Sequence, residues 1–279
     1  MSFYRYFKFE DSLKTLSSLC LRMSDPRHFN DPFEFNPVID LSDITYDKAT
    51  VYFGSEKGLE GIYREKGTKE PYTQFKENFL KTELKGFVNK WLDNRHVHEE
   101  KMSFQSALCP RFNVVCGSFT PLSILMWSHY AEKHSGVVIE FNQNESPFSR
   151  IQRIGRLINV NYEDKRPLYK FGFDHSELEL LEKFNQVART KYTCWGYEKE
   201  VRAVLPVGDD IVKTRVIKKL DDHYYLSITP RSISSVIMGS RIENTSYEAL
   251  RGILNQEFFK HIQLKKCFLS KSKFELEIE

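Results

Sequence analysis

Hydrophobic positions recur along the chain with two different periods, and these periods predict its strands and helices. Aromatic and β-branched residues alternate with polar ones or form short apolar runs in several segments, which is typical of strands. Strands are predicted at residues 3–7, 21–23, 114–120, 137–141, 157–162, 201–205, 224–228, 235–239 and 274–278. Spacings of three and four residues predict helices after Asp11, at 72–91 with a broken continuation to 108, and at 122–133, 178–188 and 247–258.

The order of these elements indicates the fold class. The strands cluster after residue 112 and do not alternate regularly with helices, as they would in a parallel α/β fold. We therefore predict an α+β fold with a mixed or antiparallel central sheet, flanking helices and a helical insertion.

A polar segment interrupts this pattern near residue 41. Between residues 41 and 68 the hydrophobic periodicity is lost and four glycines occur, which favours a long loop or a small insertion. Helical spacing returns at Tyr72. Residues 41–110 are accordingly predicted as a loop and helical insertion within a single domain of residues 1–279.

Composition narrows the classes of function. The 279 residues are 41% hydrophobic and 14% aromatic, which predicts ordered packing throughout. Forty-one basic against 38 acidic residues give a net charge of +3, too balanced for a general nucleic-acid coat or a membrane anchor. No apolar run approaches the ~18 residues that span a bilayer, and the N-terminus lacks a secretory signal pattern. We expect a cytoplasmic protein with no membrane partner.

The segment 126–130 is the first candidate for a functional site. Helical spacing places Trp127 and Tyr130 on one face and His129 on another. One interpretation is a helix buried on two sides, with His129 satisfied by a backbone carbonyl. The alternative is that all three side chains project into a pocket, where they would hold a planar ligand.

The segment 195–202 is the second candidate. If the chain is extended there, Glu198, Glu200 and Arg202 share one face, because the strand period is two. Two carboxylates ~7 Å apart raise each other's pKa unless a cation or a ligand compensates. Either a solvated, ion-paired strand edge or a ligand site is compatible with this pattern.

Two further positions are compatible with an anionic ligand. Ser118 and Thr120 lie where a strand leads into a helix, which suits either an ordinary helix cap, with Thr120 as cap and Pro121 in the first turn, or a site for an anion or a ribose hydroxyl. Arg5 in the first strand is either a surface residue stacked on its aromatic neighbours or a phosphate ligand.

Several common sites are missing from the sequence. It contains no phosphate-binding loop, no dinucleotide-binding glycine motif, no nucleophile elbow and no zinc-protease motif. The five cysteines form no C-x-x-C pair. The run His96 to Glu100 has no third ligand at a useful spacing, so no metal site is predicted.

Three motifs carry a resemblance to a known family. The chain contains NDPFE at 30–34, MWSHYA at 126–131 and WxxExExR at 195–202. In this order they resemble a widespread prokaryotic group, the domain-of-unknown-function family twenty-nine seventy-one. The resemblance extends from Tyr4 to about Gly239.

The chain also has a more distant similarity to NAD-dependent ADP-ribosyltransferases. An arginine on a first strand, a hydroxyl motif on a middle strand and a Glu-x-Glu on a later strand are similar to the residue set of those enzymes. The resemblance implies an ADP-ribosyltransferase-like fold and NAD as substrate. It implies that Arg5 binds the pyrophosphate, Ser118 and Thr120 support the ribose pocket, and Glu200 is catalytic with Glu198 assisting.

Within that resemblance, Trp127, Tyr130 or Tyr197 would stack on nicotinamide. The acceptor would be a macromolecule, nucleic acid or protein, and the protein would be a toxin or antiphage effector with an antitoxin or defence-system partner. Two alternatives stay open. One is a non-catalytic nucleotide- or partner-binding module built on Trp127, His129, Tyr130 and Arg202; the other is a metal-independent nuclease or hydrolase that uses His129 with Glu198 or Glu200.

Overall fold

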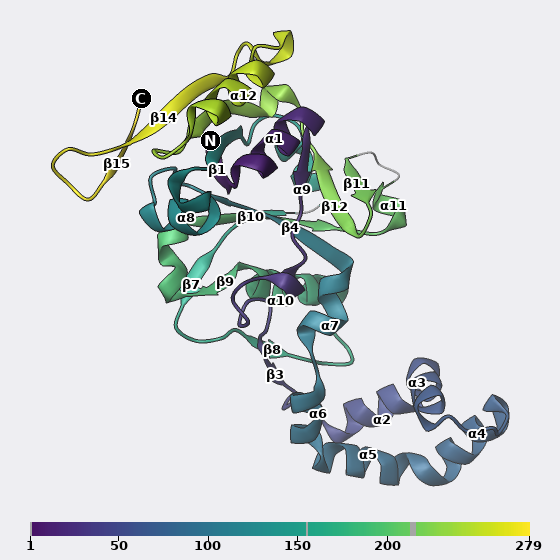
Figure 1. Ribbon diagram of the computed structural model, residues 1–279. Helices are drawn as coiled ribbons and strands as arrows, with labels where there is room; N and C mark the ends of the chain where they lie inside the picture. The colour runs from purple at the N-terminus through teal and green to yellow at the C-terminus, as the bar shows by residue number, and fades with distance from the viewer. Residues whose placement is uncertain (1, 155, 213–215) are drawn as a thin grey trace. The chain divides into compact units, whose positions relative to one another are not determined.

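The computed structural model describes residues 2–154, 156–212 and 216–279, which divide into two compact units (Figure 1). The first unit comprises Met1–Phe35, Gln105–Lys165 and Ala188–Glu279; the second comprises Asn36–Phe104 and Arg166–Val187. The insertion predicted at 41–110 thus corresponds in large part to the second unit. That unit also takes in residues 166–187, which the sequence pattern did not assign to it.

An eight-stranded mixed sheet forms the centre of the first unit and confirms the predicted α+β class. Its order is β15-β14-β13-β5-β1-β4-β10-β6, and β13 and β14 are its parallel pair while its other neighbours are antiparallel. The strands are β1 (Ser2–Phe7), β4 (Phe112–Ser118), β5 (Val137–Asn142), β6 (Arg156–Asn159), β10 (Glu200–Pro206), β13 (Ile233–Met238), β14 (Gln263–Leu269) and β15 (Leu276–Ile278).

Helices cover both faces of this sheet because its strands are apolar on both sides. Phe3 and Phe7 of β1 belong to a core that includes residues of α1 (Phe9–Ser18), α9 (Phe148–Ile154) and α12 (Asn244–Leu254). Tyr6, on the opposite side of β1, packs in a separate core with Trp127 of α8 (Ile124–Tyr130). The alternation along β1 therefore separates two hydrophobic cores.

The two halves of the sheet meet at a single residue pair. β1 and β4 pair only at Tyr4 and Ser118, whereas β1 pairs with β5 from Ser2 to Phe7. Close approach at this junction requires a glycine at position 117. A Cβ there would lie 2.4 Å from Cδ2 of Phe3, closer than any real contact allows.

Smaller elements complete the first unit. A three-stranded antiparallel sheet contains β11 (Ile217–Leu220), β12 (His223–Ser227) and β2 (Cys20–Arg22), and a two-stranded parallel sheet contains β7 (Asn161–Glu163) and β9 (Thr190–Tyr192). A short helix α11 (Asp209–Val212) precedes β11. Two of the four unit boundaries fall inside helices, one in α7 (Phe104–Leu108) and one in α10 (Glu177–Arg189).

The second unit is mainly helical, and here one prediction was wrong. It contains β3 (Val38–Asp40), β8 (Leu168–Lys170), α2 (Tyr46–Gly54), α3 (Glu56–Lys66), α4 (Tyr72–Asn78), α5 (Leu84–Asp93) and α6 (Arg95–Lys101). The predicted loop at 41–68 is largely α2 and α3. Gly58 lies inside α3, where a Cβ would be 2.2 Å from the Tyr52 carbonyl oxygen, and Gly67 ends the helix with φ of 56°. These glycines thus serve close packing and helix termination.

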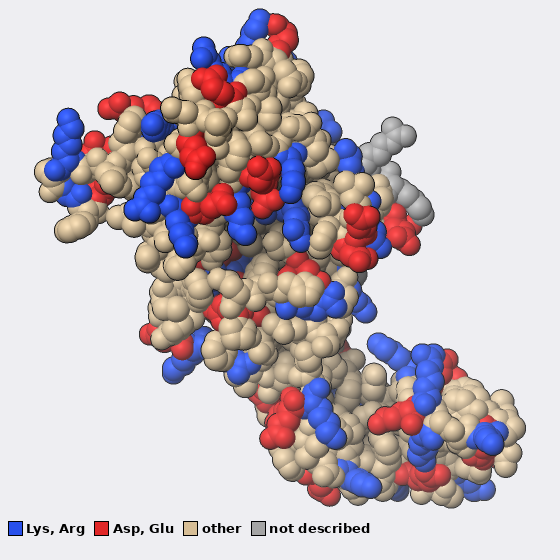
Figure 2. Space-filling view, in the orientation of Figure 1, with Lys and Arg blue, Asp and Glu red and all other residues tan. Residues whose placement is uncertain are grey.

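No helix in the described parts of the chain is both long enough and apolar enough to cross a membrane. Figure 2 shows Lys and Arg side chains interspersed with Asp and Glu over the face in view. No single sign of charge dominates that face, in keeping with the net charge of +3.

Candidate functional site

A cavity of about 880 Å³ opens in the first unit beside the junction of β1 and β4. Two strands of the large sheet line it through Tyr4, Arg5, Tyr6, Asn113, Cys116 and Gly117. Its other walls come from residues between 22 and 34, from α8, from the segment 191–200 and from the start of β12. The cavity therefore collects segments that lie far apart in the sequence.

Lys191 of β9 is the centre of a buried ion-pair network in the cavity wall. Its Nζ lies 2.5 Å from Oε2 of Glu198, 3.0 Å from Oε1 of Glu34 and 3.2 Å from Oε2 of Glu200. None of these four side chains is more than 5% exposed. Buried charges cost several kcal/mol each unless they are paired, so the network depends on all its members.

Arg202 of β10 is the second cation of the network and is fully buried. It holds Glu200 with two parallel bonds, from Nε to Oε1 at 2.7 Å and from Nη2 to Oε2 at 2.8 Å. Its Nη2 also pairs with Glu34, and its Nη1 donates to the carbonyl oxygen of Ala188 at 3.0 Å. This bidentate geometry suits the planar guanidinium of arginine.

The backbone between the two glutamates explains how both reach Lys191. We predicted from strand alternation that Glu198, Glu200 and Arg202 share one extended face. The structure corrects this for Glu198, which ends a 3₁₀ helix (Thr193–Glu198) before β10 begins at Glu200. Lys199 between them is left-handed, with φ of 44°. This turn lets both carboxylates approach Lys191 from different elements.

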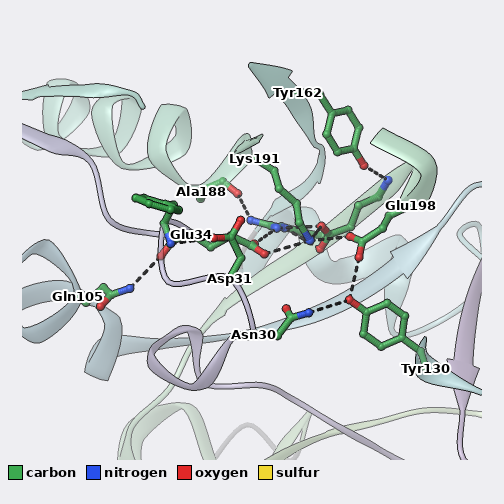
Figure 3. Close-up of polar contacts among 12 residues, drawn as sticks. Asn30, Asp31, Glu34, Gln105, Tyr130, Tyr162, Ala188, Lys191 and Glu198 are labelled. Atoms are coloured by element: carbon green, nitrogen blue, oxygen red, sulfur yellow. Dashed lines mark hydrogen bonds and ion pairs between the residues drawn. The ribbon is translucent and has the colours of Figure 1, made fainter. Parts of the chain in front are cut away.

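A chain of hydrogen bonds links α8 and the NDPFE motif to the network (Figure 3). Asn30 Nδ2 donates to the Tyr130 hydroxyl at 3.2 Å, and this hydroxyl donates to Oε1 of Glu198 at 2.8 Å. Tyr130 is the last residue of α8, whose cap is Ser123, bonded to the Met126 N–H. The predicted start of this helix at residue 122 with Thr120 as cap, and its predicted end at 133, were therefore wrong.

The NDPFE motif places Glu34 by a local turn. The Asp31 carboxylate accepts from the N–H of Phe33, and the N–H of Glu34 donates to the Asp31 carbonyl oxygen. Gln105 Nε2 then donates to the Glu34 carbonyl oxygen at 2.9 Å. With Tyr130 and the Glu-x-Glu segment, all three motifs singled out in the sequence meet at one network (Figure 3).

The network contains three carboxylates against two cations and so carries one net negative charge when all are ionised. Burial raises the pKa of Glu34 and of Glu198 above the usual range, despite their cationic partners. Burial acts in the same direction on Glu200, but Arg202 and Lys191 outweigh it and lower the pKa of Glu200 to about 2. Glu200 therefore stays ionised, while Glu34 and Glu198 accept a proton more readily.

The cavity is also lined by an arginine from β1, Arg5. Arg5 is half-buried, its guanidinium lies over the ring of Phe7, and its buried Nη1 has no hydrogen-bond partner within the described chain. Burial lowers the pKa of Arg5, and the nearby Arg22 lowers it further. Arg22 lines the same cavity and contacts the imidazole of His223 at 3.1 Å. A guanidinium with an unpartnered nitrogen beside a second arginine suits an anionic group.

The structure confirms a position in the cavity wall for some of the residues predicted for the site but not for others. Tyr130, His129, Glu198 and Glu200 line the cavity together with Arg5, and His129 is exposed rather than in the core. The expectation that Trp127 faces a pocket is corrected, because its side chain is fully buried and its Nε1 donates to the Pro121 carbonyl oxygen at 2.7 Å.

Ser118 and Thr120 lie next to the cavity-lining residue Glu198 but do not line the cavity themselves. The buried Ser118 hydroxyl donates to the Glu198 carbonyl oxygen at 2.5 Å and accepts from the Thr120 N–H. Tyr197 packs between the rings of Trp195 and His129, with centroids 6.1 and 6.3 Å away. None of the three is among the residues that line the cavity, and neither is Arg202. Ser118 therefore holds the backbone of Glu198.

Sequence reasoning gave no role to four residues of the site: Asn30, Glu34, Lys191 and Arg22. Asn30 and Glu34 belong to the NDPFE motif. Glu34 could have been found from there, because a buried arginine such as Arg202 needs an acidic partner. Lys191 gave no periodic signal because β9 has only three residues.

The segment 96–100, which superficially resembles a metal cluster, has structural roles in α6. The ring of His98 stacks on Trp91 with centroids 4.8 Å apart, and the Glu99 carboxylate accepts from the Leu41 N–H at 2.8 Å. Within the described ranges, no group of three or more His, Cys, Asp or Glu side chains is arranged to hold a metal ion.

Comparison with known proteins gives one finding for these residues. No curated protein and no solved structure matches the chain. The Asn30–Glu34 motif lies outside the range that a family model matches. Residues 126–203, which carry Tyr130, Lys191 and the Glu-x-Glu segment, match the model of the family described as Protein of unknown function (DUF2971), and this confirms over that range the resemblance drawn from the motifs.

Proposed function

We propose that the protein is an NAD-dependent ADP-ribosyltransferase-like enzyme whose substrate binds in this cavity. One observation carries the proposal: a single cavity combines Arg5, whose Nη1 has no hydrogen-bond partner among the described residues, with a wall in which three carboxylates face two cations. NAD has a matching distribution, since its nicotinamide ring is cationic and its pyrophosphate is anionic. The volume of about 880 Å³ falls in the range of ~300–1,000 Å³ for ligand pockets.

The carboxylates suit the reaction that this proposal requires. The bond between the ribose C1′ and the nicotinamide nitrogen breaks, and its electron pair neutralises the ring. Positive charge then develops on the ribosyl group, which a fixed and buried carboxylate stabilises. A nucleophile of the acceptor adds its electron pair to C1′ and loses its proton. The products are a modified acceptor, nicotinamide and a proton.

The proposal gives roles to residues in and next to the cavity. Arg5 binds the pyrophosphate, with Arg22 beside it, and Ser118 supports the ribose side by holding the Glu198 backbone. His129 and Tyr130 provide the aromatic wall for nicotinamide. The acceptor is a macromolecule, nucleic acid or protein, and the protein acts in the cytoplasm as a toxin or antiphage effector with an antitoxin or defence-system partner.

Incubation with NAD tests the proposal. We expect the wild-type protein to release nicotinamide and to be stabilised by NAD in a thermal-shift titration. Arg5→Gln should weaken NAD binding about 10- to 100-fold, because a hydrogen bond to a charged group is worth about 1.5–3 kcal/mol. Arg251→Gln is the matched control, since Arg251 is exposed on α12 and does not line the cavity.

The two readouts separate the alternatives. Stabilisation by NAD without nicotinamide release would favour a binding module in place of an enzyme. If NAD neither stabilises the protein nor yields nicotinamide when candidate protein and nucleic-acid acceptors are present, the proposal is contradicted.

A further inference from the structure

We propose that Glu198 is the carboxylate that acts on the ribosyl group and that Glu200 is a structural anchor. This assignment rests on the proposed function and deepens it. The Glu-x-Glu resemblance gave the main role to Glu200 and an assisting role to Glu198. The contacts of the two side chains support the reverse order.

Glu200 has little capacity left for a ligand. Arg202 engages both of its oxygens at 2.7 and 2.8 Å, and Lys191 adds a contact at 3.2 Å to Oε2. The thiol of Cys116 donates to the same carboxylate. Two cations and a thiol thus occupy the acceptor positions of Glu200, so a substrate hydroxyl would have to displace one of them.

Glu198 is held less tightly on one side. Lys191 binds Oε2, whereas among the described residues Oε1 accepts a single hydrogen bond, from the neutral hydroxyl of Tyr130. A carboxylate oxygen can accept from two donors, so Oε1 can receive a ribose hydroxyl beside Tyr130 or in its place. Burial raises the pKa of Glu198, which brings it closer to the range in which a carboxylate exchanges protons.

The reaction step assigns one proton and one charge to Glu198. As the C1′–nitrogen bond breaks, the ionised carboxylate faces the positive ribosyl group. When the acceptor nucleophile bonds to C1′, its proton passes to Oε1, and the protonated Glu198 later releases it to solvent. Lys191 keeps its proton throughout, because the surrounding carboxylates raise its pKa despite burial. It therefore acts as a fixed cation rather than as a nucleophile.

The balance of charge makes Glu198→Gln a usable variant. Removing one carboxylate leaves two anions, Glu34 and Glu200, against Lys191 and Arg202. The amide keeps the size of the side chain, so the protein should fold. Glu200→Gln instead weakens the bidentate partner of Arg202 and should lower the melting temperature. Activity is therefore compared per folded molecule, with circular dichroism for each variant.

Nicotinamide release from NAD in the presence of acceptor is the measurement. We expect Glu198→Gln to lower kcat about 10²- to 10⁴-fold, the usual contribution of a general base, with little change in thermal stabilisation by NAD. In Glu200→Gln, kcat per folded molecule should fall by less than about tenfold. Glu248→Gln, an exposed change on α12, serves as the matched control.

Two results would overturn the assignment, and they differ from each other. If the wild type releases nicotinamide and Glu198→Gln releases it at the same rate, the assignment fails while the proposed function stands. If the wild type releases none with any acceptor, the proposed function fails and the assignment fails with it.

Tyr130→Phe adds a readout that a purely structural role would not move. The hydroxyl of Tyr130 stabilises the ionised form of Glu198, so its loss should raise the pKa of Glu198 further. The acidic limb of the kcat profile should then shift to higher pH in Tyr130→Phe. An unshifted profile would contradict a role for Glu198 as the titrating group.

Discussion

At the scale of single residues, Arg202 holds two of the three carboxylates of the buried network, Glu200 and Glu34. Arg202→Met would leave Glu34 and Glu200 buried with only Lys191 as cation. We expect the free energy of unfolding to fall by about 3–5 kcal/mol, the usual cost of removing one partner from a buried ion pair. Urea denaturation measures this, with Arg251→Gln as a control for loss of an exposed arginine. A loss below about 1 kcal/mol would mean that the network adds little to stability.

Two pH windows separate the carboxylates of the network. Glu200 has a pKa of about 2 in the folded protein against its usual 4.5, so its stabilisation is present above pH 4.5 and is lost as pH falls towards 2. Glu198 has a raised pKa, so its contribution is present below 4.5 and is lost as pH rises through its folded value. Glu198→Gln should therefore flatten the stability profile only above pH 4.5. Flattening confined to lower pH would contradict this assignment.

Residue chemistry could be predicted from the sequence only where a residue stood in a recognisable motif. Glu198, Glu200, Tyr130 and Arg5 were found in this way and line one cavity. Lys191 was missed because its role depends on three acids brought together by the fold. Trp127 was placed in a pocket because its helix is apolar on more than one face, which describes a helix packed on two sides equally well.

At the scale of elements, the central strands could be predicted because their runs are apolar and short. The helices α2 and α3 could not, since their glycines resemble loop signals although they allow close packing. The start of α8 was misplaced by three residues or fewer because Thr120, Pro121 and Ser123 all suit the beginning of a helix.

The close approach of β1 to β4 predicts that Gly117 cannot be replaced without a loss of stability. Gly117→Ala would place a Cβ 2.4 Å from the buried ring of Phe3, so the junction must shift. We expect a loss of about 1–3 kcal/mol, as for overpacked cores. Gly252→Ala in α12 meets nothing within 4 Å and should add about 0.5–1 kcal/mol through helix propensity. Equal effects of the two changes in chemical denaturation would refute the packing argument.

At the scale of the whole molecule, each unit has a hydrophobic core of its own. The core of the second unit includes Phe53, Phe79 and Val88, with Trp91 packed against it, whereas Trp127 belongs to the first unit. We expect two unfolding transitions in scanning calorimetry. Trp91→Phe should remove the fluorescence change of one transition and leave the other. A single transition with coincident probes would show that the units unfold as one.

The network also bears on how related chains should be compared. Its charges come from a turn near residue 34, a three-residue strand at 190–192, the end of the 3₁₀ helix at Glu198 and the start of β10, so no short segment of the sequence contains it. A homologue that keeps Glu-x-Glu but has a neutral residue at position 34 or 191 would hold a different net charge in the same place. Chains should thus be grouped by the sum of charges at positions 34, 191, 198, 200 and 202 before an activity is transferred between them.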